Sequence, residues 1–229
     1  MKQHTVRSFD EAMQRVTADL LRMGRIVQDE LRTATSQLDN TAADDVQPML
    51  DLEEWVDTLN ERIDREVQQT LALRQPVAAD LRALMSSNRI ATEMERIGDH
   101  AKNMTRRAAI IAEQGVPMDF SRVRGLAEAV QAQLAAILTA IEQTDAEAAK
   151  IIWGKDAQID GLYDEAFSTH LAEICQTPDN AVSCTHMLFI AKALERIGDH
   201  VTNMAEDLIY WVSAERLSKR ATGGMASQS

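Results

Sequence analysis

The hexapeptide ERIGDH at residues 95–100 returns without change at residues 195–200, and Asn-Met follows each copy at 103–104 and 203–204. Apolar residues surround both copies at alternating steps of four and three, from Ile90 to Ile111 and from Ile190 to Trp211. That spacing is typical of a long amphipathic helix with one continuous apolar stripe. The repeat therefore predicts two homologous halves, each carrying the motif on a long helix.

The composition favours an all-α fold. Strong helix formers such as Ala, Leu, Glu, Gln and Arg are plentiful, whereas aromatic residues make up 4% of the 229 residues and glycines number 9. We expect two tandem homologous three-helix bundles. The expected limits are a first bundle at 1–114, a linker at 115–119, a second bundle at 120–217 and a disordered tail at 218–229.

Capping and proline signals set the expected helix limits. In the first half we expect helices at about 8–38, 41–73 and 77–114, with a capping box at Ser8 and a kink or start at Pro48. In the second half we expect helices at about 121–143 and 144–175, and a sixth helix that carries the second copy of the motif and fades after Leu217. Ser121 is expected to cap the fourth helix, and a second capping box at Thr144 to open the fifth.

The net charge of -12 disfavours a nucleic-acid partner, because proteins that bind phosphate backbones present basic surface. No apolar run approaches the ~20 residues of a transmembrane helix. The first residues also lack the apolar region of a signal peptide. We therefore expect a cytoplasmic protein that does not insert directly into a membrane.

Paired carboxylates are the chemically notable feature of the repeat. Glu95 and Asp99 lie four residues apart and off the apolar stripe, as do Glu195 and Asp199, so each pair points away from the core. Oxygen ligands of this kind suit Mg, Mn, Fe or Zn ions. Further carboxylates on neighbouring helices could complete such sites if those helices turn the same face outward, and the candidates are Asp64, Asp156 and Asp160.

The alternative interpretation of each acidic pair is a solvated helix face. For Gly98 and Gly198, close helix packing is favoured over access of a ligand or another helix to the backbone. Arg96 and Arg196 are each expected to form an ion pair with the carboxylate three residues later. The flanking histidines, His100 and His200, would act as ligands or hold a carboxylate in place.

A zinc site is disfavoured. Two cysteines, Cys175 and Cys184, lie near His170 and His186, but the spacing His-x4-Cys-x8-Cys-x-His matches no familiar zinc module. We expect both thiols to be reduced. The sequence also lacks a P-loop, a Gly-x-Ser-x-Gly motif, a Rossmann glycine pattern and the Glu-x-x-His pairs of di-iron proteins, which indicates that the protein is not an enzyme.

Residues 95–104, their second copy, residues 71–82 and residues 159–163 together resemble the PhoU family over about residues 5–217. The resemblance implies two three-helix bundles with multinuclear metal sites at Glu/Asp-x3-Asp motifs, here Glu95, Asp99, Glu195 and Asp199. Asn60 stands where the second half has Asp156, so the first site is expected to bind metal more weakly.

The resemblance also implies a non-enzymatic regulator that restrains the phosphate-starvation response and modulates phosphate uptake. Its implied partners are a phosphate-sensor histidine kinase and the ATPase subunit of the phosphate ABC transporter. We further expect a homodimer. A metal-dependent phosphohydrolase and a metal-free helical scaffold remain as alternatives.

Overall fold

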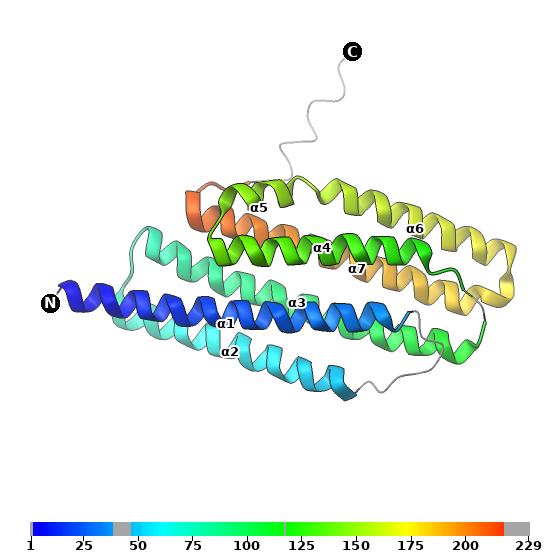
Figure 1. Ribbon diagram of the computed structural model, residues 1–229, viewed down its shortest axis with the longest axis horizontal. Coiled ribbons are helices and arrows are strands. Elements are labelled where there is room, and N and C mark those ends of the chain that lie inside the picture. Colours follow the sequence, from blue (N-terminus) through cyan, green and yellow to red (C-terminus); the bar gives the residue numbers. More distant parts are fainter. Residues whose placement is uncertain (1, 39–46, 117, 218–229) are drawn as a thin grey trace, which may run out of the picture.

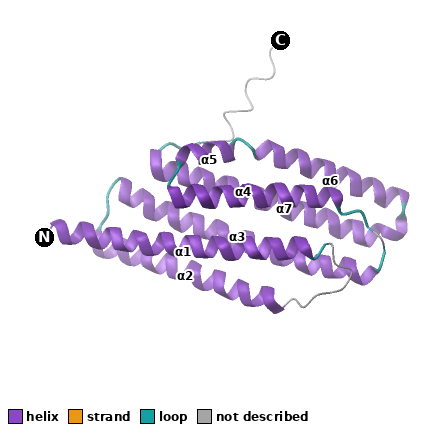
Figure 2. Ribbon diagram, viewed as in Figure 1, coloured by secondary structure: helices purple, strands orange, loops and turns teal. Residues whose placement is uncertain are grey.

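The computed structural model describes residues 2–38, 47–116 and 118–217, and the side chains of 9–38, 54–116 and 118–217. The described residues form seven α-helices and one short 3-10 turn, and no strand occurs among them (Figure 2). The predicted all-α fold class is confirmed.

Each half of the chain contributes one bundle (Figure 1). The helices of the first half are α1 (Lys2–Ser36), α2 (Gln47–Arg74) and α3 (Ala79–Gln114). Those of the second half are α4 (Ser121–Gln143), α5 (Ala146–Trp153), α6 (Asp156–Gln176) and α7 (Ala181–Ser213), with the 3-10 turn η1 (Pro178–Asn180) between α6 and α7. The two bundles lie side by side along the long axis, so the molecule is elongated (Figure 1).

The apolar stripes form the core, as their spacing predicted. Fully buried residues of α3 and α7 lie at matching positions: Ile90, Met94, Ile97, Ala101 and Met104, then Ile190, Leu194, Ile197, Val201 and Met204. Burying each larger apolar side chain stabilises the fold by about 1.5–3 kcal/mol. The buried residues of both halves belong to one connected core, so the boundary at 115–119 stays a prediction.

Two limits in the first half differ from the prediction. α1 already begins at Lys2, so Ser8 lies inside the helix, and the prediction of a capping box at Ser8 is wrong. α3 begins at Ala79 and not at Val77, because Gln75 and Ala78 have positive φ angles of 46° and 49° that a helix cannot contain. The expected opening of the second helix at 41–44 lies outside the described residues. Its described part begins at Gln47, with Pro48 in the first turn.

The caps of the second half were assigned to the wrong residues. Ser121 is the first residue of α4 and not its cap, because Phe120 occupies the N-cap position and makes no side-chain cap hydrogen bond. The Asp119 side chain accepts a hydrogen bond of 2.9 Å from the Ser121 backbone N–H. Thr144 ends α4 in the left-handed conformation, with φ 54°. Asp145 is the true N-cap of α5, and its side chain accepts from the backbone N–H groups of Glu147 and Ala148.

The helix expected at 144–175 is broken in two. α5 ends at Trp153 and α6 begins at Asp156, with Gly154 and Lys155 between them. Glycine has a low helix propensity. At the break, the Lys155 carbonyl accepts hydrogen bonds from the Gln158 backbone N–H at 3.0 Å and from the Gln133 side chain at 3.4 Å. α7 ends at Ser213, four residues before the predicted limit, because Ala214 adopts a left-handed φ of 61°. The predicted tail at 218–229 lies outside the described residues.

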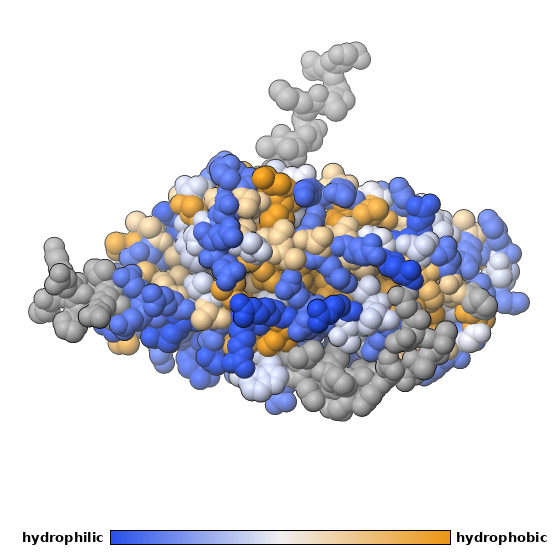
Figure 3. Space-filling model, viewed as in Figure 1, coloured by the Kyte–Doolittle hydropathy of each residue, from blue (hydrophilic) through white to orange (hydrophobic). Residues whose placement is uncertain are grey.

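Polar side chains cover much of the visible surface. In Figure 3 hydrophilic residues predominate along α1, and hydrophobic ones gather over the alanine-rich α4 in the middle of the view. Within the described ranges, no helix combines the length and the apolar character that a membrane crossing requires.

Candidate functional site

The two copies of the repeated motif meet at the contact between the bundles. α3 and α7 run antiparallel along each other (Figure 1), and the rings of His100 and His200 stack with centroids 5.4 Å apart. On one side of this stack Arg89 forms an ion pair of 2.9 Å with Asp207. On the other side the Arg107 guanidinium lies 4.1 Å from the centroid of the Phe189 ring. The motif therefore lies at the centre of an internal, quasi-twofold contact between the bundles.

Glu93 links α3 to α7 at this centre. Its Oε2 lies 2.6 Å from His200 Nδ1 and accepts a hydrogen bond of 3.1 Å from the Asn203 amide. Burial raises the pKa of Glu93, but the hydrogen bonds from His200 and Asn203 and the nearby positive charges outweigh it, so the pKa is lowered. His200 thus holds a carboxylate, one of the two roles expected for it, but this carboxylate lies outside the motif. Arg96 also pairs with Glu93, at 3.6 Å, and not with Asp99.

Both motif glycines allow a close approach between helices. A Cβ added at Gly98 would lie 2.8 Å from Oε2 of Glu30 on α1. A Cβ added at Gly198 would lie 2.9 Å from Cγ2 of Ile159 on α6. Both distances are shorter than real Cβ contacts. At Gly198 the neighbour is an apolar side chain of the adjacent helix, so the packing interpretation is confirmed there. At Gly98 the neighbour is the flexible end of the Glu30 side chain, so packing at that position stays a prediction.

The first acidic pair belongs to a cluster built from three helices. Glu95 is half-buried and Asp99 is exposed on α3. Glu30 on α1 is only 2% exposed, and burial together with the charges of Asp57 and Asp99 raises its pKa to about 7. Burial and neighbouring acidic groups also raise the pKa of Asp57 and of Glu95. Four carboxylates therefore act on one another here.

This first cluster differs from the predicted ligand set. Asp64 accepts a hydrogen bond of 2.6 Å from Gln68 on its own helix, and Asp57 and Glu61 of α2 interact with the cluster instead. Asp57 and Glu61 have the i, i+4 spacing of the motif, so a direct search for such pairs on α2 could have found them. Glu30 gave a different signal, because it interrupts the apolar face between Val27 and Ala34.

The second acidic pair has a mixed-charge environment. Glu195 forms an ion pair of 2.7 Å with Lys192, and Asp199 lines a groove of about 690 Å³ with Arg196 and His200. From α6, the half-buried Asp156 accepts a hydrogen bond of 3.0 Å from Thr202. Asp160 is exposed, one residue after the Ile159 side chain that packs on Gly198.

The acidic side chains do not converge into a closed ligand set. Among the described residues, the one group of three or more His, Cys, Asp or Glu side chains with ligand atoms within 4.8 Å of one another is His170, Glu173 and Cys184. The motif carboxylates are instead spread over the helix surfaces. Such an arrangement could hold cations that bridge several helices, with solvent completing the coordination.

The PhoU domain family matches this chain twice, at residues 20–108 and 123–208. The chain is 34% identical over 221 residues to the phosphate-specific transport system accessory protein PhoU homolog of Caulobacter vibrioides (strain NA1000 / CB15N), covering 96% of both proteins. It is also 34% identical over 226 residues to the protein of the same name from Rhizobium meliloti (strain 1021), covering 98% of this chain and 95% of that one.

Two solved structures of PhoU proteins are also similar to this chain. The crystal structure of PhoU from Pseudomonas aeruginosa has a TM-score of 0.86 at 30% identity, covering 90% of this chain and 100% of that one. The structure of the phosphate transport system regulatory protein PhoU from Streptococcus pneumoniae has a TM-score of 0.84 at 22% identity, covering 92% and 99%, and supports the fold alone. The predicted pair of tandem repeats is confirmed by the double match of the domain, and the chain belongs to the PhoU family.

Proposed function

We propose that this protein is a negative regulator of the phosphate regulon and a modulator of phosphate uptake. In this proposal it binds a phosphate-sensor histidine kinase and the ATPase subunit of the phosphate ABC transporter. The observation that carries the proposal is the double match of the PhoU domain, together with relatives named phosphate-specific transport system accessory proteins that match almost the whole chain. The protein would act by binding, on the cytoplasmic side of the membrane, as a homodimer.

The groove on α7 supports a role in partner binding. Lys192 and Arg196 alternate there with acidic side chains, so its surface has mixed charge. The whole chain carries a net charge of -12, which favours partners with basic or mixed surfaces. Binding should weaken as salt rises, because the Debye length is only ~10 Å at 0.1 M ionic strength.

The acidic clusters support a metal-binding component of this function. In the first cluster Glu30, Asp57, Glu95 and Asp99 would hold the cations, and in the second Asp156, Asp160, Glu195 and Asp199 would do so. The fit is clearest at Glu30, because its buried Oε2 has no hydrogen-bond partner. The charges of Asp57 and Asp99 repel the Glu30 carboxylate, and the charges of Asp99 and Glu61 repel that of Asp57. A hard or borderline cation such as Fe, Zn, Mn or Mg would replace this repulsion with attraction.

Metal would have a structural and electrostatic role in this proposal. Cations shared by Glu30, Asp57 and Asp99 would hold α1, α2 and α3 together at the position of the motif. They would also place positive charge on an otherwise acidic surface, which a partner could recognise. Asp64 would stay outside the first cluster because its carboxylate is bound to Gln68.

A reporter for a phosphate-responsive promoter tests the regulatory proposal. In a strain that lacks this protein, reporter output should stay high in phosphate-rich medium, and phosphate uptake should be disturbed. Restoring the intact gene should restore repression. Identical output in the deletion and parent strains, at both high and low phosphate, would remove the regulatory function and return the phosphohydrolase alternative to consideration.

A further inference from the structure

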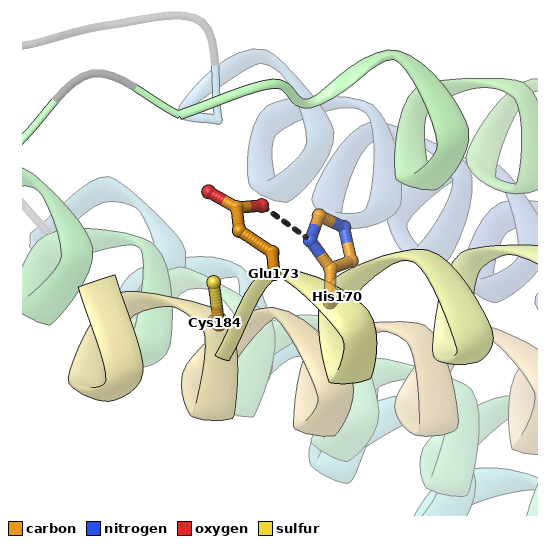
Figure 4. Close-up of side chains that lie close together, drawn as sticks. All are labelled: His170, Glu173 and Cys184. Carbon is orange, nitrogen blue, oxygen red and sulfur yellow. Dashed lines mark ion pairs between the residues drawn. The ribbon is translucent and has the colours of Figure 1, made fainter. Parts of the chain in front are cut away.

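A third cluster of ligand-type side chains, separate from the two acidic clusters, lies between α6 and α7, near the turn that joins them. His170 and Glu173 come from α6 and Cys184 comes from α7, and one ligand atom of each lies within 4.8 Å of those of the others. Figure 4 shows the three side chains beside one another, and His170 Nδ1 lies 3.6 Å from Glu173 Oε2. Unlike the acidic clusters, this group combines sulfur, nitrogen and oxygen donors.

The local sequence positions these three side chains. His170 and Glu173 are three residues apart, so they share one face of α6. Residues 177–180 then reverse the chain through η1, which brings the beginning of α7 with Cys184 against that face. Asn180 at the turn donates a hydrogen bond of 3.0 Å to Glu173 Oε1. That bond fixes the carboxylate and leaves Oε2 directed toward His170.

The histidine in this cluster is buried without a proper partner. His170 is 1% exposed, and neither of its ring nitrogens has a hydrogen-bond partner. Leaving a buried polar group without a hydrogen bond destabilises the folded state, so these nitrogens call for an explanation in a well-packed helix pair. The Cys184 thiol is fully buried as well.

We propose that His170, Glu173 and Cys184 form a zinc site that links α6 to α7. One thiolate, one imidazole and one carboxylate are a donor set that borderline Zn²⁺ accepts, whereas Mg²⁺ and Ca²⁺ avoid sulfur. Bonds of about 2.0–2.3 Å in a tetrahedral site separate neighbouring ligand atoms by roughly 3.3–3.7 Å. The 3.6 Å between His170 Nδ1 and Glu173 Oε2 already fits this range, and the ligand atoms of all three residues lie within 4.8 Å of one another, so a small closing movement would complete the site. A water would take the fourth position of the tetrahedral site.

The arrangement explains why the sequence pattern was not recognisable as a zinc site. Cys175 is exposed, and His186 lies 3.4 Å from the Arg107 side chain, so neither belongs to the cluster. The ligand that completes it, Glu173, is three residues after His170 and outside the His/Cys patterns of familiar zinc modules. The site is independent of the acidic motifs and of the proposed regulatory function.

Cobalt substitution tests the proposal on the full chain. After removal of bound metals with a chelator, Co²⁺ should produce a thiolate-to-cobalt charge-transfer absorption in the near ultraviolet that saturates at one ion per chain, and Zn²⁺ should abolish it. Carboxylate-bound Co²⁺ gives no such absorption, so the acidic clusters do not contribute to it. His170→Gln should weaken Co²⁺ binding, measured by this absorption, at least tenfold.

The two cysteines provide a matched control. Cys175→Ser should leave the absorption unchanged, which by itself assigns it to Cys184 because the chain has 2 cysteines. Cys184→Ser should abolish the absorption while far-ultraviolet circular dichroism shows the same helicity; if that variant does not fold, the Cys175→Ser result still decides. A parent protein without the absorption, or an absorption lost in Cys175→Ser, would overturn the zinc site and leave a simple buried His170–Glu173 pair.

Discussion

Glu30 places a carboxylate on the apolar face of α1, where it is only 2% exposed. Its pKa is raised from 4.5 to about 7, first by burial and then by the charges of Asp57 and Asp99. The folded protein therefore holds this proton more tightly than the unfolded chain does. The resulting stability is fully present below pH ~4.5 and is lost as the pH rises through about 7.

This loss of stability with rising pH predicts the effect of Glu30→Gln on the metal-free protein. The glutamine cannot ionise, so the variant should exceed the parent in free energy of unfolding at pH 8, by up to about 3 kcal/mol, and the difference should shrink toward pH 5. Urea unfolding at both pH values measures this. Glu128→Gln, at an exposed position of α4, is the control and should show no such difference. If the free energies of unfolding of Glu30→Gln and the parent changed in parallel with pH, Glu30 would not be a buried carboxyl group with a raised pKa.

The motif glycines provide a second prediction at the residue scale. A Cβ at Gly198 would meet Ile159, whereas one at Gly125 of α4 would meet nothing within 4 Å. Gly198→Ala should therefore lower the free energy of unfolding by about 1–2 kcal/mol through overpacking. Gly125→Ala should raise it by up to about 1 kcal/mol through helix propensity. Denaturant unfolding of both variants measures the contrast, and an equal gain in both would show that α6 and α7 are not tightly packed at Gly198.

At the scale of elements, the contact between α3 and α7 depends on Glu93. Glu93→Ala would leave His200 and the Asn203 amide without their partner, so it should cost about 1–3 kcal/mol of stability. Arg96→Ala removes an exposed partner of the same carboxylate and should cost less than about 0.5 kcal/mol. Thermal unfolding of the two variants measures the difference. Equal effects would mean that the buried bonds of Glu93 do not stabilise the contact.

The acidic pairs make a prediction about metal content. The double variants Glu95→Ala/Asp99→Ala and Glu195→Ala/Asp199→Ala should each bind less metal, with helicity unchanged because these side chains lie off the apolar stripes. Elemental analysis and far-ultraviolet circular dichroism on the same samples measure both properties. The control is Glu113→Ala/Glu128→Ala, which changes two exposed acidic residues outside the clusters. Unfolding of the motif variants, with unchanged metal per folded molecule, would show that the pairs are structural.

The helices themselves could be predicted from the sequence because apolar periodicity is a local property. Ile97 and Ile197 lie on stripes that any reader of the sequence can trace, and both are fully buried. The meeting of Glu30 with Asp57 could not be predicted in the same way. It depends on the register between α1 and α2, and Asp64 of α2 was the candidate ligand predicted from the sequence instead. The break at Gly154 was missed because the flanking residues are helix formers.

At the scale of the whole molecule, the quasi-twofold packing of α3 on α7 places both acidic motifs near one contact between the bundles. A duplicated domain thereby presents related acidic surfaces on one elongated body with a net charge of -12. The His100–His200 stack marks the centre of this arrangement. A partner that recognises one motif region would therefore meet a similar region in the other half, which could strengthen binding through two linked contacts.

Complementation of a deletion strain tests most directly the claim that the motif regions carry the function. The variant with alanine at Glu95, Asp99, Glu195 and Asp199 is compared with one that has alanine at the exposed residues Glu113, Glu128, Glu142 and Asp164, which changes the net charge equally. The account predicts that, at equal protein levels in phosphate-rich medium, the motif variant leaves the phosphate-responsive reporter high and the control variant represses it as the parent does. Full repression by the motif variant would contradict the account.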